Sequence, residues 1–293
     1  MAINLDFLYL FDSHQRIYWV YLLAALSIAL IYSKLKPETK YFTKAIWWHP
    51  SAQLDYKYFI LSLFIKVLII SPLLISVNEV AFFVVKFLEQ NLVYHDRLLL
   101  NKTTIMISFT VILFLLNDMT RYWLHRLMHS SDILWRFHKI HHSAEVLTPL
   151  TFYRVHPVEN ILFGLRYAFT AGVVSGVFVY YFGAKVSVYE VMGVNVFLLF
   201  FSLIGSNLRH SHIHLSYGKF LEHIIVSPAQ HQLHHSVNSM NKNYGSSLAI
   251  WDYMGNSLKC YTFEKKMKYG LGTTEEKVSH SLSALLFHPF NQK

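Results

Sequence analysis

The sequence predicts an all-α, polytopic membrane protein with about four to five membrane helices and a cytosolic, histidine-rich helical cap. Three observations predict this fold class. Of the 293 residues, 54% are hydrophobic and only 15% are charged, whereas about a quarter of a soluble domain is charged. Long apolar segments recur along the chain, and most of its 18 histidines gather between positions 125 and 235. No linker-like segment divides the chain, so we expect a single membrane-embedded domain over residues 1–293.

Five segments are apolar and long enough to cross or enter a bilayer, which takes roughly 17–25 helical residues. Because lipid offers backbone groups no hydrogen bonds, we expect each segment to be helical. The segments are residues 17–33, 58–76, 103–120, 160–182 and 187–206. The amphipathic residues 77–90 are expected to lie at the membrane interface.

The charged loops predict how these helices are oriented. Lysines are concentrated in loop 34–57, which the positive-inside rule places in the cytoplasm. Two further crossings return the chain there near residue 120, and the last two apolar segments form a hairpin that leaves and returns on one side. We therefore predict an integral multi-pass protein in which residues 121–157, and those after 207, lie on the cytoplasmic face. We expect this membrane to be a bacterial inner membrane or the endoplasmic reticulum, and the sequence leaves the choice between them open.

Composition also excludes several kinds of site. The single cysteine, Cys260, cannot form an internal disulfide, and zinc or iron–sulfur sites built on cysteine need several thiolates. The net charge of +9 is spread along the chain without a basic stripe. This distribution favours a membrane surface over nucleic acid as a partner.

The histidines fall into four groups, and these carry the chemistry. They are HRLMH at 125–129, HKIHH at 138–142, HSHIH at 210–214 and HQLHH at 231–235. Residues three and four apart are neighbours on one face of a helix, so each group presents two or three imidazoles in one direction. Neutral imidazole is a good ligand for iron, zinc or copper. A lone buried histidine is usually a hydrogen-bonded core residue, but composition does not account for HxxHH occurring twice.

Ten of these histidines suit two metal ions with four or five ligands each. The predicted ligands are His125, His129, His138, His141, His142, His210, His214, His231, His234 and His235. Ligating histidines usually donate their second ring N–H to a carboxylate or a carbonyl. Asp118 lies about two helical turns before His125 and is a candidate for this role. Glu159 and Asp252 are further candidates, although Asp252 could also cap a helix.

The order of the four groups resembles that of the fatty acid hydroxylase superfamily of integral membrane non-haem di-iron enzymes. This superfamily includes sterol desaturases, sterol methyl oxidases and alkylglycerol monooxygenase. The resemblance covers about residues 110–255, the expected catalytic core, and includes NDMTRYWLHRLMH, LWRFHKIHHSAE and SPAQHQLHHSVNSMNKNYGSSLAIWDYMG. It implies that the histidines ligate two iron ions, in place of which a purified sample can carry zinc.

The third histidine group matches the family pattern least closely. His210 matches best and His214 is its expected partner, while His212 stands where many bacterial members have asparagine; the choice between His212 and His214 stays open. His156, in HPVE, resembles a motif of the methyl oxidase and bacterial branches. It is expected to support a ligand or line the pocket.

The resemblance implies oxidation of a membrane lipid or sterol, by hydroxylation or desaturation, with O2 as co-substrate. The segment NYGSSLAIWDYMG is most similar to the sterol C-5 desaturase and alkylglycerol monooxygenase branches. We find no GxGxxG fingerprint in a strand–turn–helix context and no haem-binding segment. Electrons are therefore expected from outside, from a cytochrome b5, a ferredoxin-type donor or a pterin. The lipid, the carbon attacked and the oligomeric state stay open.

Two other functions use the same residues. A zinc-dependent membrane hydrolase usually has three protein ligands and an open position, fewer than the histidines counted here. A metal-ion transporter would carry ionisable residues deep within its spans, whereas the histidines avoid the centres of the apolar segments.

Overall fold

The computed structural model describes residues 10–13, 15–36, 42–92, 98–183, 186–188, 190–191, 194–262, 267–272, 278 and 281–291. Apart from a two-stranded hairpin, the regular elements of this part are helices. The longer ones are α1 (Trp19–Leu35), α3 (Pro50–Ile65), α5 (Val77–Asn91), α6 (Lys102–Ser130), α7 (Asp132–His142), α8 (Pro157–Phe182), α9 (Val196–Leu203) and α10 (Pro228–His235). Short helical elements are α2 (Lys44–Trp47), the π-helix η1 (Lys66–Ile70), α4 (Ser71–Leu73), α11 (Ile250–Met254) and α12 (Leu282–Phe287), with 3₁₀ turns η2 (Pro149–Tyr153), η4 (Ser206–Arg209), η5 (Leu221–His223) and η6 (His288–Phe290).

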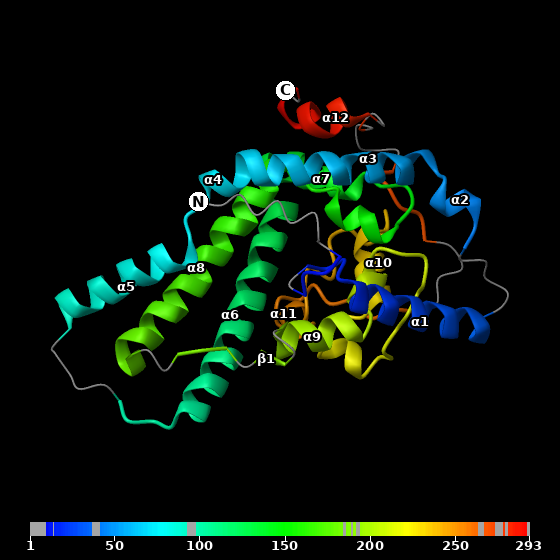
Figure 1. The fold of residues 1–293 in the computed structure, drawn as a ribbon. Helices are drawn as coiled ribbons and strands as arrows, with labels where there is room; N and C mark the ends of the chain where they lie inside the picture. Colours follow the sequence, from blue (N-terminus) through cyan, green and yellow to red (C-terminus); the bar gives the residue numbers. More distant parts are fainter. Residues whose placement is uncertain are drawn as a thin grey trace.

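The long helices form one end of the molecule and the shorter ones gather at the other (Figure 1). Helix α8 packs against both α5 and α6, and α3 runs across the top of the view towards the shorter helices. Gly172 and Gly176 bring α8 close to α5, because a Cβ at Gly172 would lie only 2.4 Å from Cβ of Val80. Small residues commonly permit such close approach between membrane helices.

Among the residues that the structure describes, three segments are long and apolar enough to cross a membrane: Pro50–Asn91, Lys102–Ser130 and Pro157–Phe182. In the most apolar window of the first, only 6% of the residues are buried inside the protein, so its apolar side chains face outward. This segment contains α5, which we expected at the interface but which packs along α8. Helix α1 is apolar but shorter, so the structure shows three long candidates where the sequence predicted four to five spans.

The predicted membrane helix at 187–206 is wrong. Among the described residues, this region contains an antiparallel hairpin, β1 (Glu190–Val191) with β2 (Val194–Asn195), followed by α9. The Asn195 side chain caps α9 by accepting from the backbone N–H of Phe197, and Gly205, at φ 110°, follows its end. An eight-residue helix is about 12 Å long, well short of a hydrocarbon core of about 30 Å.

The candidate site lies where the long helices meet the shorter ones. Helix α6 continues beyond its apolar part, and α7 begins two residues after its end. Ile140 on α7 is fully buried in an apolar core with Leu54 and Tyr58 of α3, which fixes α7 beneath α3. Helix α7 thereby presents its histidines to α6 on one side and to α10 on the other.

Candidate metal centre

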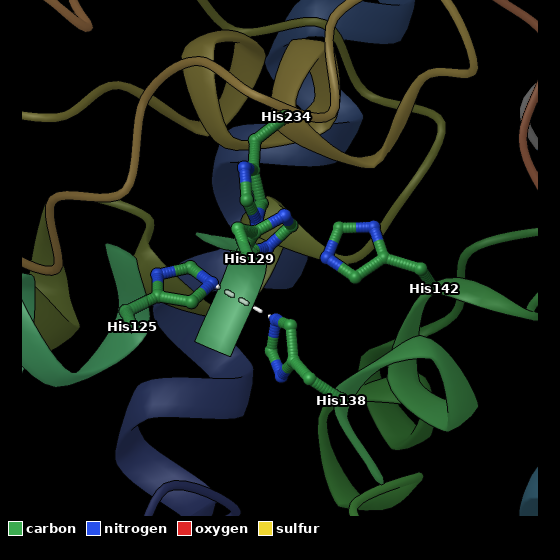
Figure 2. Close-up of side chains that lie close together, drawn as sticks. All are labelled: His125, His129, His138, His142 and His234. Atoms are coloured by element: carbon green, nitrogen blue, oxygen red, sulfur yellow. Dashed lines mark hydrogen bonds between the residues drawn. The ribbon is translucent and has the colours of Figure 1, made fainter. Parts of the chain in front are cut away.

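In space, the histidines of the four sequence motifs form two sets, which are called the first and the second histidine group from here on. The first histidine group contains five imidazoles from three helices. His125 and His129 come from α6, His138 and His142 from α7, and His234 from α10. One ring nitrogen of each lies within 4.8 Å of those of the others. Figure 2 shows the five rings arranged around a common space.

The second histidine group contains His141 of α7, His210 directly after η4, and His231 and His235 of α10. Nε2 of His210 lies 3.2 Å from Nε2 of His141, 3.1 Å from that of His235 and 3.1 Å from that of His231. Nε2 of His231 and Nε2 of His235 are 3.2 Å apart. Four ring nitrogens therefore converge on one point.

Hydrogen bonds among the rings cannot account for this convergence. A ring nitrogen carries at most one proton, so Nε2 of His210 cannot be satisfied by three other Nε2 atoms. In addition, both ring nitrogens of His142, Nε2 of His234 and Nδ1 of His231 are buried without a hydrogen-bond partner in the described part of the chain. Nitrogens spaced about 3.2 Å apart around one centre lie about 2 Å from it, close to the length of a metal–imidazole bond. Both groups fit a metal ion.

The rings outside the candidate spans are held in their neutral, metal-binding form. Burial lowers the pKa of His138 to about 3, and burial together with the neighbouring His138 lowers the pKa of His141 to about 4. Burial first, and then neighbouring imidazoles, lower the pKa of His142, His210, His231, His234 and His235 well below 6.5. These rings are therefore uncharged at neutral pH.

Several rings are oriented through the nitrogen that faces away from the common space. His138 donates from Nδ1 to Oε1 of the buried Glu159 over 2.9 Å. His125 donates to the Tyr244 carbonyl over 2.7 Å, and His234 to the Lys242 carbonyl over 2.8 Å. The oxygen accepts the hydrogen bond in each case, so the proton stays on Nδ1 and the lone pair of Nε2 is left free for a metal ion.

Asp118 and Asp252 act on a loop rather than on a ring. Asp118 accepts from the backbone N–H groups of Ser247 and Leu248 and from the indole of Trp251, not from His125 as we expected. Asp252 accepts from the backbone N–H of Tyr244 over 2.8 Å. Both carboxylates thus fix the loop whose Tyr244 carbonyl orients His125.

Asn243 lies between the two carbonyls that orient His234 and His125, and the sequence analysis did not identify it. It is buried in the left-handed backbone region, at φ 58°, a conformation that asparagine tolerates better than most residues. Its side chain donates to the carbonyls of Gln230 and Lys259 and accepts from the N–H of Lys259. The motif NYG, which begins eight residues after His235, was the available signal, because asparagine followed nearby by glycine is typical of a turn.

The remaining candidates lie outside both groups. His156 caps α8 by accepting from the N–H of Val158, and its Nε2 donates to the Leu286 carbonyl. Nδ1 of His214 bonds to the side chain of Gln232, and Nε2 of His212 accepts from the N–H of Leu147. The structure therefore brings together nine of the ten predicted ligands and leaves His214 apart.

Residues 110–257, half of the chain, match the family model described as "Fatty acid hydroxylase". The chain belongs to this family. An ornithine lipid hydroxylase of Rhizobium tropici is 29% identical over 174 residues, which are 59% of this chain and 47% of the relative. An alkylglycerol monooxygenase of Danio rerio is 33% identical over 139 residues, or 47% of this chain and 27% of the relative. A lathosterol oxidase of Mus musculus is 30% identical over 186 residues, or 63% of this chain and 56% of the relative.

The match to these relatives of the fatty acid hydroxylase family thus spans between about a quarter and somewhat over half of their length. By name they are lipid or sterol oxidoreductases. No solved structure matches the chain significantly.

Proposed function

We propose that this protein uses O2 to hydroxylate or desaturate a membrane lipid or sterol at two iron ions. The observation that carries the proposal is the adjacency of the two histidine groups. His141 and His142 are consecutive on α7 but belong to different groups, and the His142 ring stacks on that of His235 with centroids 4.6 Å apart. Two metal ions bound there would be neighbours, as a di-iron reaction requires.

The ligands we propose are the nine converging histidines, without His214. They are His125, His129, His138, His142 and His234 for one ion and His141, His210, His231 and His235 for the other. Five and four imidazoles exceed the three protein ligands typical of a hydrolytic zinc site, which favours the oxidative function over a hydrolase.

The bound irons would supply the redox chemistry with which O2 attacks an unactivated C–H bond. The chain's own residues hold the ions and keep water away. Glu159 fixes the orientation of the His138 ring, and the Trp135 indole lies 5.0 Å from the ring of His129 and 5.6 Å from that of His142. Such aromatic walls exclude water, which would otherwise divert a reactive oxidant.

The substrate is proposed to reach the centre from the membrane, because α6 carries two of the ligands and is itself a candidate span. The lysines of loop 34–57 support a cytoplasmic location for the centre. An external donor, of the cytochrome b5, ferredoxin or pterin type, would deliver the electrons there.

The test compares wild type with His142→Ala after purification from cells in which both reach the same membrane abundance. The metal content of the purified protein is measured by elemental mass spectrometry. The lipids of the whole cells are compared by lipid mass spectrometry. We expect two irons per wild-type chain and a lipid that has gained one oxygen or lost two hydrogens. In the His142→Ala variant we expect the full iron content and the oxidised lipid to be lost.

His214→Ala is the matched control, because it removes a half-buried imidazole that lies outside both groups. It should keep both metal ions and the lipid product. Metal loss in this variant would restore His214 to the ligand set. Full metal content together with unchanged lipids in every variant, when a donor is supplied, would contradict the oxidative function.

A further inference from the structure

An arginine that is distant in sequence lies beside the second histidine group. Arg16 donates from Nε to the side chain of Asn207 over 3.1 Å and from Nη2 to the Ser206 carbonyl. Its guanidinium lies 4.3 Å from the centre of the Phe152 ring, and the same ring is 6.0 Å from that of His210. Arg16 is therefore one aromatic ring away from a proposed ligand.

A second arginine, Arg209, belongs to the same turn and is only 7% exposed. Its Nη2 reaches the Val226 carbonyl at 3.5 Å, the limit of a hydrogen bond, and its Nε has no partner among the described residues. Buried guanidinium groups normally use most of their five N–H donors. Arg209 thus has unused donors in the interior.

Arg121 on α6 completes the cluster. Its guanidinium lies 5.3 Å from the centre of the Phe163 ring. Burial, and then repulsion from Arg209 and from Arg121, lower the pKa of Arg16 to about 9. Arg16 and Arg209 therefore lie beside the second histidine group, and Arg121 is close enough to repel both of them.

No carboxylate lies within ion-pairing distance of these three arginines in the described ranges. Asp118 is near enough to act on Arg209, but its oxygens already accept from two backbone N–H groups and an indole. Asp118 and Glu159 also act on Arg121, but Glu159 is already bonded to His138. The proposed ligands are all neutral, so bound metal ions would add further positive charge. Burying charge without a partner is costly, which favours an anion that binds here.

We propose that Arg16, Arg121 and Arg209 bind the anionic head group, a phosphate or a carboxylate, of the lipid that is oxidised. Planar guanidinium groups match the geometry of both anions and form strong, charge-assisted hydrogen bonds to them. That the lipid is a substrate rests on the function proposed above; the anion site does not. The site favours a charged lipid over a sterol, whose hydroxyl group would leave the arginines unneutralised. It also places the oxidised carbon near the head group.

The test is thermal unfolding of the purified full-length protein in a neutral maltoside detergent. The added probes are dodecyl phosphate, inorganic phosphate and dodecanol, each titrated over the same concentrations. We expect dodecyl phosphate to raise the apparent Tm in a saturable way and the other two to have little effect. Arg209→Gln and Arg16→Gln should each weaken this binding at least tenfold, whereas Arg136→Gln, which removes an arginine outside the cluster, should leave it unchanged.

An equal shift with inorganic phosphate would identify a site for free anions and overturn the assignment to a lipid. An equal shift with dodecanol, or no loss in Arg209→Gln and Arg16→Gln, would overturn the site itself. Should Arg209→Gln fail to fold, Arg209→Lys is the second variant. Lysine keeps the positive charge but lacks the planar set of guanidinium N–H donors, so it should weaken binding to a smaller extent. The binding measurement needs no turnover. If dodecyl phosphate binds as expected but wild type and His142→Ala show the same lipids with a donor supplied, the proposed function is refuted and the anion site stands.

Discussion

The two histidine groups share α7 and α10 but are held in different ways. In the first, Glu159 and the carbonyls of Lys242 and Tyr244 each accept from a ligand ring. In the second, His141 donates to the Arg154 carbonyl over a longer distance, 3.2 Å. The first group has five imidazoles and a carboxylate beside it, whereas the second has four imidazoles and two arginines.

This difference indicates that the two groups have different roles in the proposed centre, the first in retaining metal and the second in binding substrate. Rings that are fixed by a carboxylate and by a rigid loop hold a metal ion tightly. A group with fewer imidazoles leaves more of its metal accessible, and its arginines can receive a charged lipid. We therefore expect changes near the first group to affect metal retention and changes near the second to affect substrate binding.

The largest expected effect comes from the buried ion pair that supports the second group. Arg154 donates to Asp55 and its own carbonyl accepts from His141, and both charged side chains are almost completely buried. In Asp55→Asn the guanidinium loses its counter-charge, which typically costs about 3–5 kcal/mol. We expect the apparent Tm to fall by at least about 6 °C in thermal unfolding.

The exposed Asp132 at the start of α7 provides the control for Asp55. Asp132→Asn should change the stability by no more than about 0.5 kcal/mol. Equal effects of the two substitutions would show that the ion pair does not support the second group.

A smaller effect on stability, but a larger one on the metal, is expected for Glu159→Gln. The amide oxygen can still accept from His138, but the negative charge that makes the ring a better ligand is lost. Removal of such an outer partner typically costs 10–100-fold in metal affinity or activity. Metal release to a chelator should therefore accelerate, with the loss confined to one of the two ions.

Glu222→Gln is a matched variant, because Glu222 is fully buried and bonds to Ser216, Ser227 and Tyr261 rather than to a histidine. It should reduce stability without changing the rate of metal release. Faster release in this variant would mean that general loosening, and not the His138 contact, governs metal retention.

The smallest and most gradual effect is the response of the metal-free protein to pH. In the unfolded chain the histidines take up protons near pH 6.5, whereas in the folded protein burial lowers the pKa of His141 to about 4 and that of His138 to about 3. The unfolded state thus binds more protons in this window, so stability is greatest above pH 6.5 and declines as the pH falls towards 4.

Chemical unfolding of the metal-free protein at several pH values measures this decline. His138→Gln and His210→Gln each remove one buried imidazole, one from each group, and should each make the dependence less steep. A stability that stays constant between pH 6.5 and 4 would contradict the neutral, buried state of these rings.

The grouping of the histidines could be predicted because helical periodicity is local. Their division between two ions could not, and our expectation that each group faces one site was wrong. Positions i and i+4 share a face, and accordingly His138 pairs with His142 and His231 with His235. The histidine at i+3 lies about 100° from that at i+4, so His141 and His234 each point to the other site.

The sequence by itself therefore determined most of the apolar helices, the family and the ring nitrogens available as ligands, because composition and short-range spacing carry that information. Only the tertiary structure decided that Glu159, and not Asp118, orients a ligand ring, and that His214 stays outside both groups. It also decided that Arg16 lies beside Arg209, 193 positions later in the chain. These choices depend on which helices meet in space, and no local pattern records that.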